Sequence, residues 1–367
     1  MPVLMLAALT LPPAFAETPM DLRFGKPAIE LKLNGRGPWW FLLDSGAAPN
    51  LIVDEDLAVE LGLPVVGEDA VGDPTNPHAI PVKKVRVDRV EALGQVLDGV
   101  EALSWDRPLY RGDDRPRGVL GLGLFGDGML VTLDYPAGRV RLEKGELPLP
   151  DGITVLEAPL EHGIPQVRID VAGKPYTAHL DTGSTGFLSM PLALSKELPL
   201  AGGLTEVGRA HSVNREYIVY AAPLAGSFKL GALTVENPTV HFMESFHPNV
   251  GTDLLRNLAI TIDRKNQRLR VVSDGRPIVS SARPRLGIRT KGMQDGRIPI
   301  EGVVPGSPAE KAGLRAGDAI LRINGQAVAP MKPGDVALAM RATPVRFTLL
   351  RDGAEMDVEL SLPPEAR

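Results

Sequence analysis

Cysteine is absent from the 367 residues of this chain. Its absence excludes a disulfide framework, a cysteine-ligated zinc or iron–sulfur site and a thiol nucleophile. Long basic runs are missing too, and the net charge is −5, so nucleic acid is not expected as a partner. No segment has the roughly 20 consecutive apolar residues that cross a bilayer, so no stable membrane span is expected.

Aromatic residues make up only 5% of the chain, whereas glycine and proline are abundant, at 39 and 34 residues. So many turn-forming residues favour short strands joined by turns over long helices. With 44% apolar and 23% charged residues, the composition is that of a soluble protein with a core. The length predicts two or three domains of roughly 150 residues each.

The N-terminus carries an apolar run, residues 1–11, followed by the small residues Ala14 and Ala16. Small residues at −3 and −1 of a cut before Glu17 are typical of a secretory signal peptide. We therefore expect residues 1–16 to be a signal peptide and the protein to be exported, to a bacterial periplasm. A frayed apolar terminus is the alternative, because no Lys or Arg precedes the run.

An internal repeat organises the first two thirds of the chain. The segment FLLDSGA, from Phe41 to Ala47, is echoed by AHLDTGS, from Ala178 to Ser184, and the two aspartates are 137 positions apart. The echo keeps its register, since a Glu-Leu-x-Leu sequence begins 16 positions after each aspartate. Alternating apolar residues before each motif predict half-buried strands. A duplicated unit of this kind predicts two similar β lobes.

These patterns predict a mainly β, bilobal fold followed by a small α+β domain. After the signal peptide we expect lobe 1 over residues 17–148 and lobe 2 over residues 149–273. Residues 274–285 lose the strand pattern and predict a linker. Residues 286–364 predict the third unit, in which Ser307 caps a short helix and an Asn-Gly pair marks a hairpin turn.

Each Asp-Ser/Thr-Gly motif follows an apolar strand. One such motif alone is explained by a tight turn, in which Asp and Ser/Thr bond their own backbone and glycine takes a positive φ. The duplication at matching places is not explained in this way, because loops normally diverge faster than cores. We therefore predict that Asp44 and Asp181 meet across a local twofold axis as a pair of catalytic carboxyl groups.

The residues that follow the aspartates fit this prediction. Gly46 and Gly183 allow the two loops to approach closely, and the hydroxyl groups of Ser45 and Thr182 can hydrogen-bond across them. Carboxyl groups about 3 Å apart cannot both ionise, so they share one proton. The ionised partner can activate a water molecule and the protonated partner can polarise a peptide carbonyl, which needs neither a metal nor a cofactor.

These motifs, together with the later apolar-glycine strands, resemble the retropepsin-like and pepsin-like aspartic proteases over about residues 25–272. The resemblance implies that Asp44 and Asp181 are catalytic and that peptide bonds of protein or peptide substrates are hydrolysed. It also implies a β-hairpin flap that closes over the substrate, for which residues 75–88 and 207–222 are candidates.

Two departures from the family pattern leave alternatives open. Asn249 stands where the family prefers an apolar residue, and Gly123 stands where lobe 2 has Asp253. One alternative is a protein of the same fold that binds peptides without cutting them. Another is a homodimer whose paired lobes come from two chains; we expect a monomer, because one chain carries both motifs.

The residue that follows each motif differs between the lobes. Ser184 can donate a hydrogen bond to Asp181, whereas Ala47 has no side-chain donor. Hydrogen bonding favours the charged form of a carboxylate. We therefore predict that Asp181 is the ionised partner and that Asp44 carries the proton.

The third unit resembles PDZ domains of the bacterial periplasmic type from Gly306 to Val328. Leu286, Gly287 and Ile288 are similar to the carboxylate-binding loop of that family. The resemblance implies that the backbone of this loop holds a peptide C-terminus while the peptide adds a strand to the sheet. The alternative is a domain of the same fold that docks on the lobes without a free peptide.

Two other groups of residues are predicted to be structural. The six histidines form no metal-binding spacing, so no metal site is expected. His179 lies two positions before Asp181, and we interpret it as a structural or interface residue. The charged, proline-bearing segment from Arg111 to Arg117 predicts a solvated loop.

Overall fold

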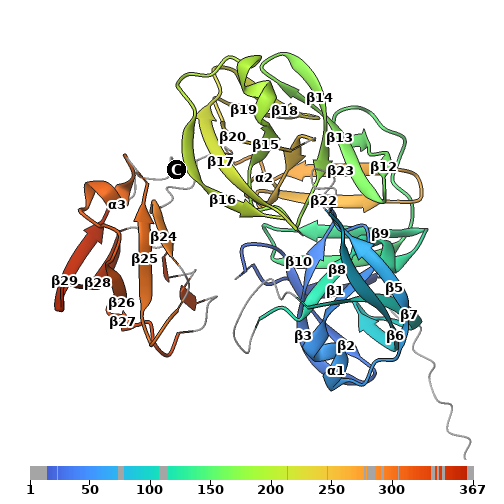
Figure 1. The fold of residues 1–367 in the computed structure, drawn as a ribbon. Helices are drawn as coiled ribbons and strands as arrows, with labels where there is room; N and C mark the ends of the chain where they lie inside the picture. Colours follow the sequence, from blue (N-terminus) through green and yellow to red (C-terminus); the bar gives the residue numbers. More distant parts are fainter. Residues whose placement is uncertain are drawn as a thin grey trace, which may run out of the picture.

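The structure is a computed structural model, and its fold is mainly β, as the sequence predicts. Two lobes lie one above the other in Figure 1, and a C-terminal domain lies beside them. The predicted signal peptide up to residue 14 and most of the predicted linker lie outside the described residues. The structure describes residues 15–22, 24–72, 78–106, 115–212, 214–245, 247–276, 278, 286–290, 293–304, 306–331, 335–336, 339–340 and 344–361.

Lobe 1 is built on a seven-stranded sheet that curls on itself, because β2 pairs with both β3 and β6. Alternate residues of β2 are buried, which is the pattern of a strand with one face on the core. In spatial order the strands are β2 (Ala28–Leu33), β3 (Arg36–Asp44), β8 (Gly118–Gly121), β4 (Leu51–Asp54), β7 (Gln95–Trp105), β6 (Ile80–Ala92) and β5 (Val65–Val71). Two short helices accompany them, α1 (Glu55–Glu60) and η1 (Leu122–Phe125).

Lobe 2 repeats this plan with a ten-stranded sheet. The strands are β16 (Thr205–His211), β17 (Glu216–Pro223), β20 (Thr239–Met243), β15 (Leu188–Pro191), β21 (Asn249–Val250), β14 (Lys174–Leu180), β13 (Ile164–Val171), β18 (Ser227–Leu230) and β19 (Leu233–Glu236), with β12 (Leu160–Glu161) paired to β13. The helices are η2 (Leu192–Lys196) and α2 (Thr252–Leu255). As in lobe 1, the strand that ends at the aspartate motif pairs in parallel with a later strand.

A third sheet joins the lobes. Its strands are β1 (Phe15–Pro19), β10 (Arg139–Lys144), β9 (Met129–Asp134), β22 (Leu258–Asp263), β23 (Arg268–Ser273) and β11 (Val155–Glu157). At its centre Thr132 of β9 is opposite Thr261 of β22, and their Oγ1 atoms lie 2.9 Å apart. Because β9 and β22 close equivalent lobes, this antiparallel pair marks the local twofold axis.

The two lobes share one continuous hydrophobic core, whereas the C-terminal domain has a core of its own. That domain consists of β24 (Ile288–Thr290), β25 (Ile298–Val303), β26 (Ala319–Ile323), β28 (Val345–Arg351), β29 (Ala354–Leu360), β27 (Gln326–Ala327) and α3 (Pro308–Lys311). The predicted cap is present, since Ser307 Oγ accepts a hydrogen bond from the Glu310 N–H at 3.2 Å.

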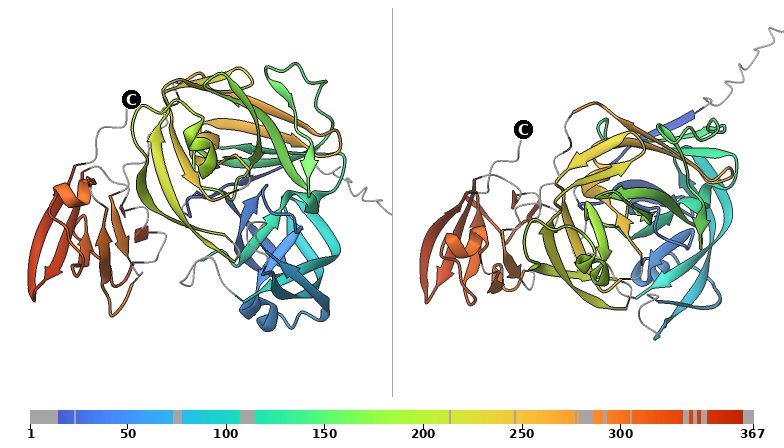
Figure 2. Two further views of the ribbon diagram at one scale, coloured as in Figure 1. Left: turned by 45° about the horizontal axis from the view of Figure 1, so that its top comes forward. Right: turned by 90° about the horizontal axis from the view of Figure 1, so that it is seen from above.

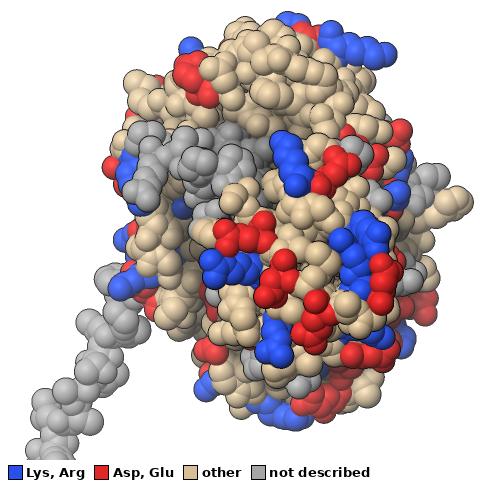
Figure 3. Space-filling model, turned by 90° about the vertical axis from the view of Figure 1, so that its left-hand side faces the viewer, with Lys and Arg blue, Asp and Glu red and all other residues tan. Residues whose placement is uncertain are grey.

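The surface of the C-terminal domain carries charges of both signs. Figure 3 shows the side of the molecule on which this domain lies, with basic and acidic side chains interspersed. Arg346 pairs with Glu359 at 2.6 Å and Arg351 pairs with Asp318 at 2.7 Å. Among the described residues, no helix is long and apolar enough to cross a membrane.

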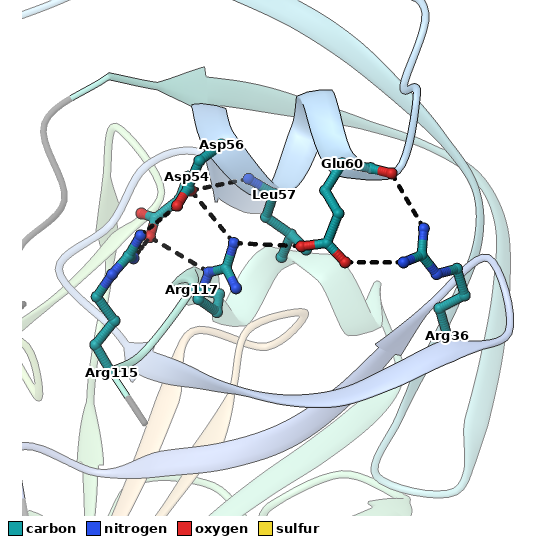
Figure 4. Close-up of polar contacts among 7 residues, drawn as sticks. All are labelled: Arg36, Asp54, Asp56, Leu57, Glu60, Arg115 and Arg117. Atoms are coloured by element: carbon teal, nitrogen blue, oxygen red, sulfur yellow. Dashed lines mark hydrogen bonds and ion pairs between the residues drawn. The ribbon is translucent and has the colours of Figure 1, made fainter. Parts of the chain in front are cut away.

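The interpretation of residues 111–117 as a solvated loop is wrong for Arg115 and Arg117; residues 111–114 lie outside the described part. The side chains of these two arginines are only 12% and 16% exposed, and Figure 4 shows them directed at the acidic residues around the start of α1. Arg115 binds Asp54, which is itself buried, and Arg117 lies 3.3 Å from Asp56. A buried carboxylate needs such counter-charges, and they tie α1 to β8, the neighbour of β3.

Candidate active site

Both predicted catalytic aspartates stand where a strand ends. Asp44 is the last residue of β3, and Asp181 follows the last residue of β14. Asp44 is opposite Gly121 of β8, and the Asp181 N–H donates to the Val250 carbonyl of β21 at 2.9 Å. The apolar residues that precede each aspartate are buried. The two motifs therefore leave the core at matching places in the two lobes.

The two motifs are fastened to each other by reciprocal hydrogen bonds. Thr182 Oγ1 accepts from the Ser45 N–H at 2.9 Å and donates to the Leu43 carbonyl at 2.7 Å. Ser45 Oγ accepts from the Thr182 N–H at 3.0 Å and donates to the Leu180 carbonyl at 2.6 Å. Ser45 and Thr182 are 1% and 0% exposed, so water cannot replace a lost partner at either hydroxyl group.

Gly46 and Gly183 allow the loops to come this close. A Cβ atom on Gly46 would lie 2.6 Å from Asp181 Cγ, and a Cβ atom on Gly183 would lie 2.2 Å from Asp44 Oδ2. Each carboxyl group thus occupies the space that a side chain on the opposite loop would fill. The structure brings together all six of the predicted residues at positions 44–46 and 181–183.

The surroundings of Asp44 disfavour its charged form. Desolvation by burial raises the pKa of Asp44 to about 7, and the neighbouring Asp181 carboxylate contributes to the rise, while Lys26 opposes it. The Gly46 N–H donates to Asp44 Oδ1 at 2.8 Å, and the Gly183 N–H donates to Asp181 Oδ1 at 2.8 Å. A raised pKa beside a second carboxyl group is typical of an acid–base pair.

Asn249 supplies the side-chain donor that was expected from Ser184. Asn249 Nδ2 donates to Asp181 Oδ2 at 2.7 Å. Within the described part of the chain, Ser184 makes no side-chain hydrogen bond to Asp181; its carbonyl accepts from the Thr252 hydroxyl at 2.6 Å. From the sequence Asn249 is only a departure from the family pattern. The signal that could identify it is a polar residue one position before Val250-Gly251, in the strand beside Asp181.

Each lobe contributes a long hairpin that contains a flap candidate. Strands β5 and β6 form the hairpin of lobe 1, and strands β16 and β17 form that of lobe 2. Residues 75–77 and 213 of the candidate segments lie outside the described part. Asn214 Nδ2 donates to the His78 carbonyl at 2.6 Å, so the turns of the two hairpins contact each other.

The predicted carboxylate-binding loop belongs to the C-terminal domain, which Figure 2 shows beside the two lobes. Leu286 is buried, Gly287 has a φ of +77°, and Ile288 begins β24. A Cβ atom on Gly287 would lie 2.1 Å from Ser307 Cβ, and the Gly287 carbonyl accepts from the Val304 N–H at 2.7 Å. The loop is therefore packed against the start of α3.

Comparison with known families agrees with this arrangement. A family model described as aspartyl protease matches residues 29–124, and a family model described as PDZ domain matches residues 278–350. No curated protein matches the chain. These two matches confirm the expected order of an aspartyl protease domain followed by a PDZ domain. Neither match covers lobe 2, whose likeness to lobe 1 rests on the repeated motif and the repeated strand pairing.

Thr182→Val should lower the free energy of unfolding by about 1–3 kcal/mol, because the Ser45 N–H and the Leu43 carbonyl would lose their partner inside the core. Urea denaturation followed by circular dichroism measures the change. Thr177→Val, at an exposed position of β14, is the matched control and should change it by less than about 0.5 kcal/mol. Equal effects of the two substitutions would show that these bonds do not hold the lobes together.

Proposed function

We propose that this protein is an aspartic endopeptidase that hydrolyses peptide bonds with a water molecule activated by Asp44 and Asp181. The observation that carries the proposal is the convergence of two strand ends, each with a carboxyl group that packs on the glycine of the opposite loop. The aspartyl protease match over residues 29–124 supports the contribution of lobe 1. The raised pKa of Asp44 supports a shared proton.

In the proposed reaction Asp181 is ionised and Asp44 carries the proton. Asp181 accepts a proton from a water molecule whose oxygen bonds to the peptide carbonyl carbon, while Asp44 gives its proton to the carbonyl oxygen. The C–N bond then breaks as the leaving nitrogen takes the proton from Asp181, and Asp44 recovers a proton from the hydroxyl group. Asn249 acts as a positioning residue, because its amide holds Asp181 Oδ2.

Two features of the lobes support a peptide substrate bound by a single chain. The hairpin turns that meet at Asn214 and His78 belong to the flap candidates. One chain supplies both carboxyl groups, so a second copy is not needed to complete the site. We infer that an extended peptide lies between the hairpins and the motifs and that the active form is a monomer.

The PDZ domain match supports peptide binding by the C-terminal domain. Strand β24 stands at one end of its sheet, so a peptide can add a strand beside Ile288. We infer that backbone N–H groups around Leu286, Gly287 and Ile288 hold the C-terminal carboxylate of a substrate or partner protein. The domain would then deliver protein substrates to the lobes.

Export to a bacterial periplasm is part of the proposal and rests on the sequence of residues 1–16. Strand β1 pairs with β10 over its five residues. A cut before Glu17 removes the first two of these residues and leaves the other three to pair. The mature chain would therefore keep an edge strand at this end of the shared sheet.

Asp44→Asn and Asp181→Asn should each lower kcat/KM for a denatured protein substrate by about 10²–10⁴-fold, because an amide can neither accept nor supply the shared proton. Release of acid-soluble peptides, with mass spectrometry of the cleavage sites, measures the loss. Asp98→Asn, at an exposed position of β7, is the control and should cut at the wild-type rate.

Two outcomes of this experiment reject the proposal. If both site variants cut at the wild-type rate, the activity belongs to another site. If the wild type binds denatured protein without cutting it, the protein is a peptide-binding relative of the same fold.

The value of kcat/KM should fall as pH rises through about 7. Burial and the neighbouring Asp181 hold the pKa of Asp44 at about 7, and the reaction needs the protonated form of this acid. Above that pH the rate should drop about tenfold per pH unit. Initial rates measured on both sides of pH 7, with circular dichroism to confirm that the chain stays folded, test the point. A rate that continues to rise on the alkaline side would contradict it.

The full chain should bind a peptide with a free C-terminal carboxylate at least about tenfold more tightly than the same peptide with an amidated terminus. Fluorescence anisotropy with labelled peptides measures both affinities. Gly287→Ala should weaken binding, because a Cβ would strike Ser307. Gly353→Ala is the matched control, since Gly353 also has a positive φ but has no neighbour within 4 Å of a Cβ. Equal affinity for the two peptides would argue for a domain that only docks on the lobes.

A further inference from the structure

Three side chains with metal-ligating atoms meet on lobe 2. Glu161, His179 and His247 each place one ligand atom within 4.8 Å of the other two. Glu161 is the last residue of β12, His179 lies in β14, and His247 lies in the loop between β20 and β21. Because the three positions are far apart in the chain, their spacing gives no metal signature in the sequence.

Backbone hydrogen bonds hold the three elements in this arrangement. Strands β12 and β14 both pair with β13, so Glu161 and His179 come from two strands that share a neighbour. The His179 N–H donates to the Pro248 carbonyl at 2.9 Å. The residue after His247 is thus bonded directly to the strand that carries His179. The strand pairing and this hydrogen bond therefore fix the backbone positions of all three residues.

The His179 side chain has a buried ring nitrogen, Nε2, that makes no hydrogen bond within the described part of the chain. Glu161 Oε2 lies 3.6 Å away, beyond hydrogen-bond distance. The His247 ring stacks on the His179 ring, with centroids 4.8 Å apart and an interplanar angle of 24°. His179 Nε2 therefore lies close to a carboxylate oxygen and to a second imidazole, so the three groups can converge on one ion.

The donor set selects the class of ligand. Two imidazole nitrogens and one carboxylate oxygen suit a divalent transition metal, and zinc in particular, with water in the fourth position. Ca²⁺ and Mg²⁺ prefer sites made of oxygen ligands. Bonds of 2.0–2.1 Å would bring the three ligand atoms to about 3.3 Å from one another. Glu161 and His247 are exposed, so rotation of their side chains can supply this movement.

A polar neighbour already orients the carboxylate. Gln166 Nε2 donates a hydrogen bond to Glu161 Oε2. In metal sites, a hydrogen bond from a neighbouring residue of this kind fixes the direction of the metal-binding side chain. The remaining oxygen, Oε1, is the one that can turn toward the two imidazoles while the bond from Gln166 is kept.

We propose that Glu161, His179 and His247 bind one Zn²⁺ ion. The proposed peptidase chemistry uses no metal, so this is a separate site, but the two share a strand. His179 lies two residues before Asp181 and is opposite Asn249 in the parallel pair of β14 and β21. A bound ion would link the loop before β21 to β14 and thereby fix the two strands that carry Asp181 and its hydrogen-bond donor.

The test is calorimetric titration of the full chain with zinc chloride after treatment with a chelator. The wild type should bind one equivalent of Zn²⁺. Glu161→Gln and His247→Ala should each weaken binding by more than about tenfold, since each removes a ligand. Both positions are exposed, and circular dichroism checks that the variants fold. His162→Asn is the matched control, because His162 is exposed beside Glu161 and has a positive φ that Asn tolerates; it should bind like the wild type.

Co²⁺ provides a second readout, because a four-coordinate site gives strong visible absorption that should be lost in His247→Ala. The proposal is overturned if the wild type binds no stoichiometric Zn²⁺, if His247→Ala binds it equally well, or if Ca²⁺ binds as tightly as Zn²⁺. None of these measurements needs peptidase activity. The metal site and the proposed function can therefore fail independently.

Discussion

The reciprocal hydrogen bonds between Ser45 and Thr182 are the interaction on which the candidate site depends. Two carboxyl groups placed side by side repel each other when both are charged. Other residues of the fold must therefore hold them together. The buried hydroxyl groups do this, because each one satisfies backbone groups of the other lobe. The shared sheet supports the same geometry farther from the site, through the pairing of Thr132 with Thr261.

The parts of the fold that could be predicted from the sequence depend on local chemistry. The repeated motif predicts two strand ends that meet, since a tight turn explains one copy of the motif but not its duplication at matching places. The close approach at Gly46 and Gly183 agrees with that prediction. The short helix of the C-terminal domain was also predictable, because Ser307 and Glu310 form a capping pattern that needs no tertiary contact.

The parts that could not be predicted depend on contacts between distant segments. Asn249 can be recognised as a donor only when β21 is known to lie beside Asp181. Gly123, the other departure from the family pattern, lies against the Asn50 side chain, whose Oδ1 would be 2.3 Å from a Cβ at this position. The burial of Arg115 against Asp54 likewise follows from the position of α1, which the charged sequence alone does not reveal.

The donor at Asn249 has no counterpart in lobe 1, where the matching residue is the buried Val119. In an assembly of two identical subunits the same residue would occupy both places, and the two acids would be interchangeable. In the proposed reaction this difference would leave the shared proton on Asp44 before a substrate binds. Asp181 alone would then activate the water molecule. A bound peptide would be cut in only one of its two N-to-C orientations across the site.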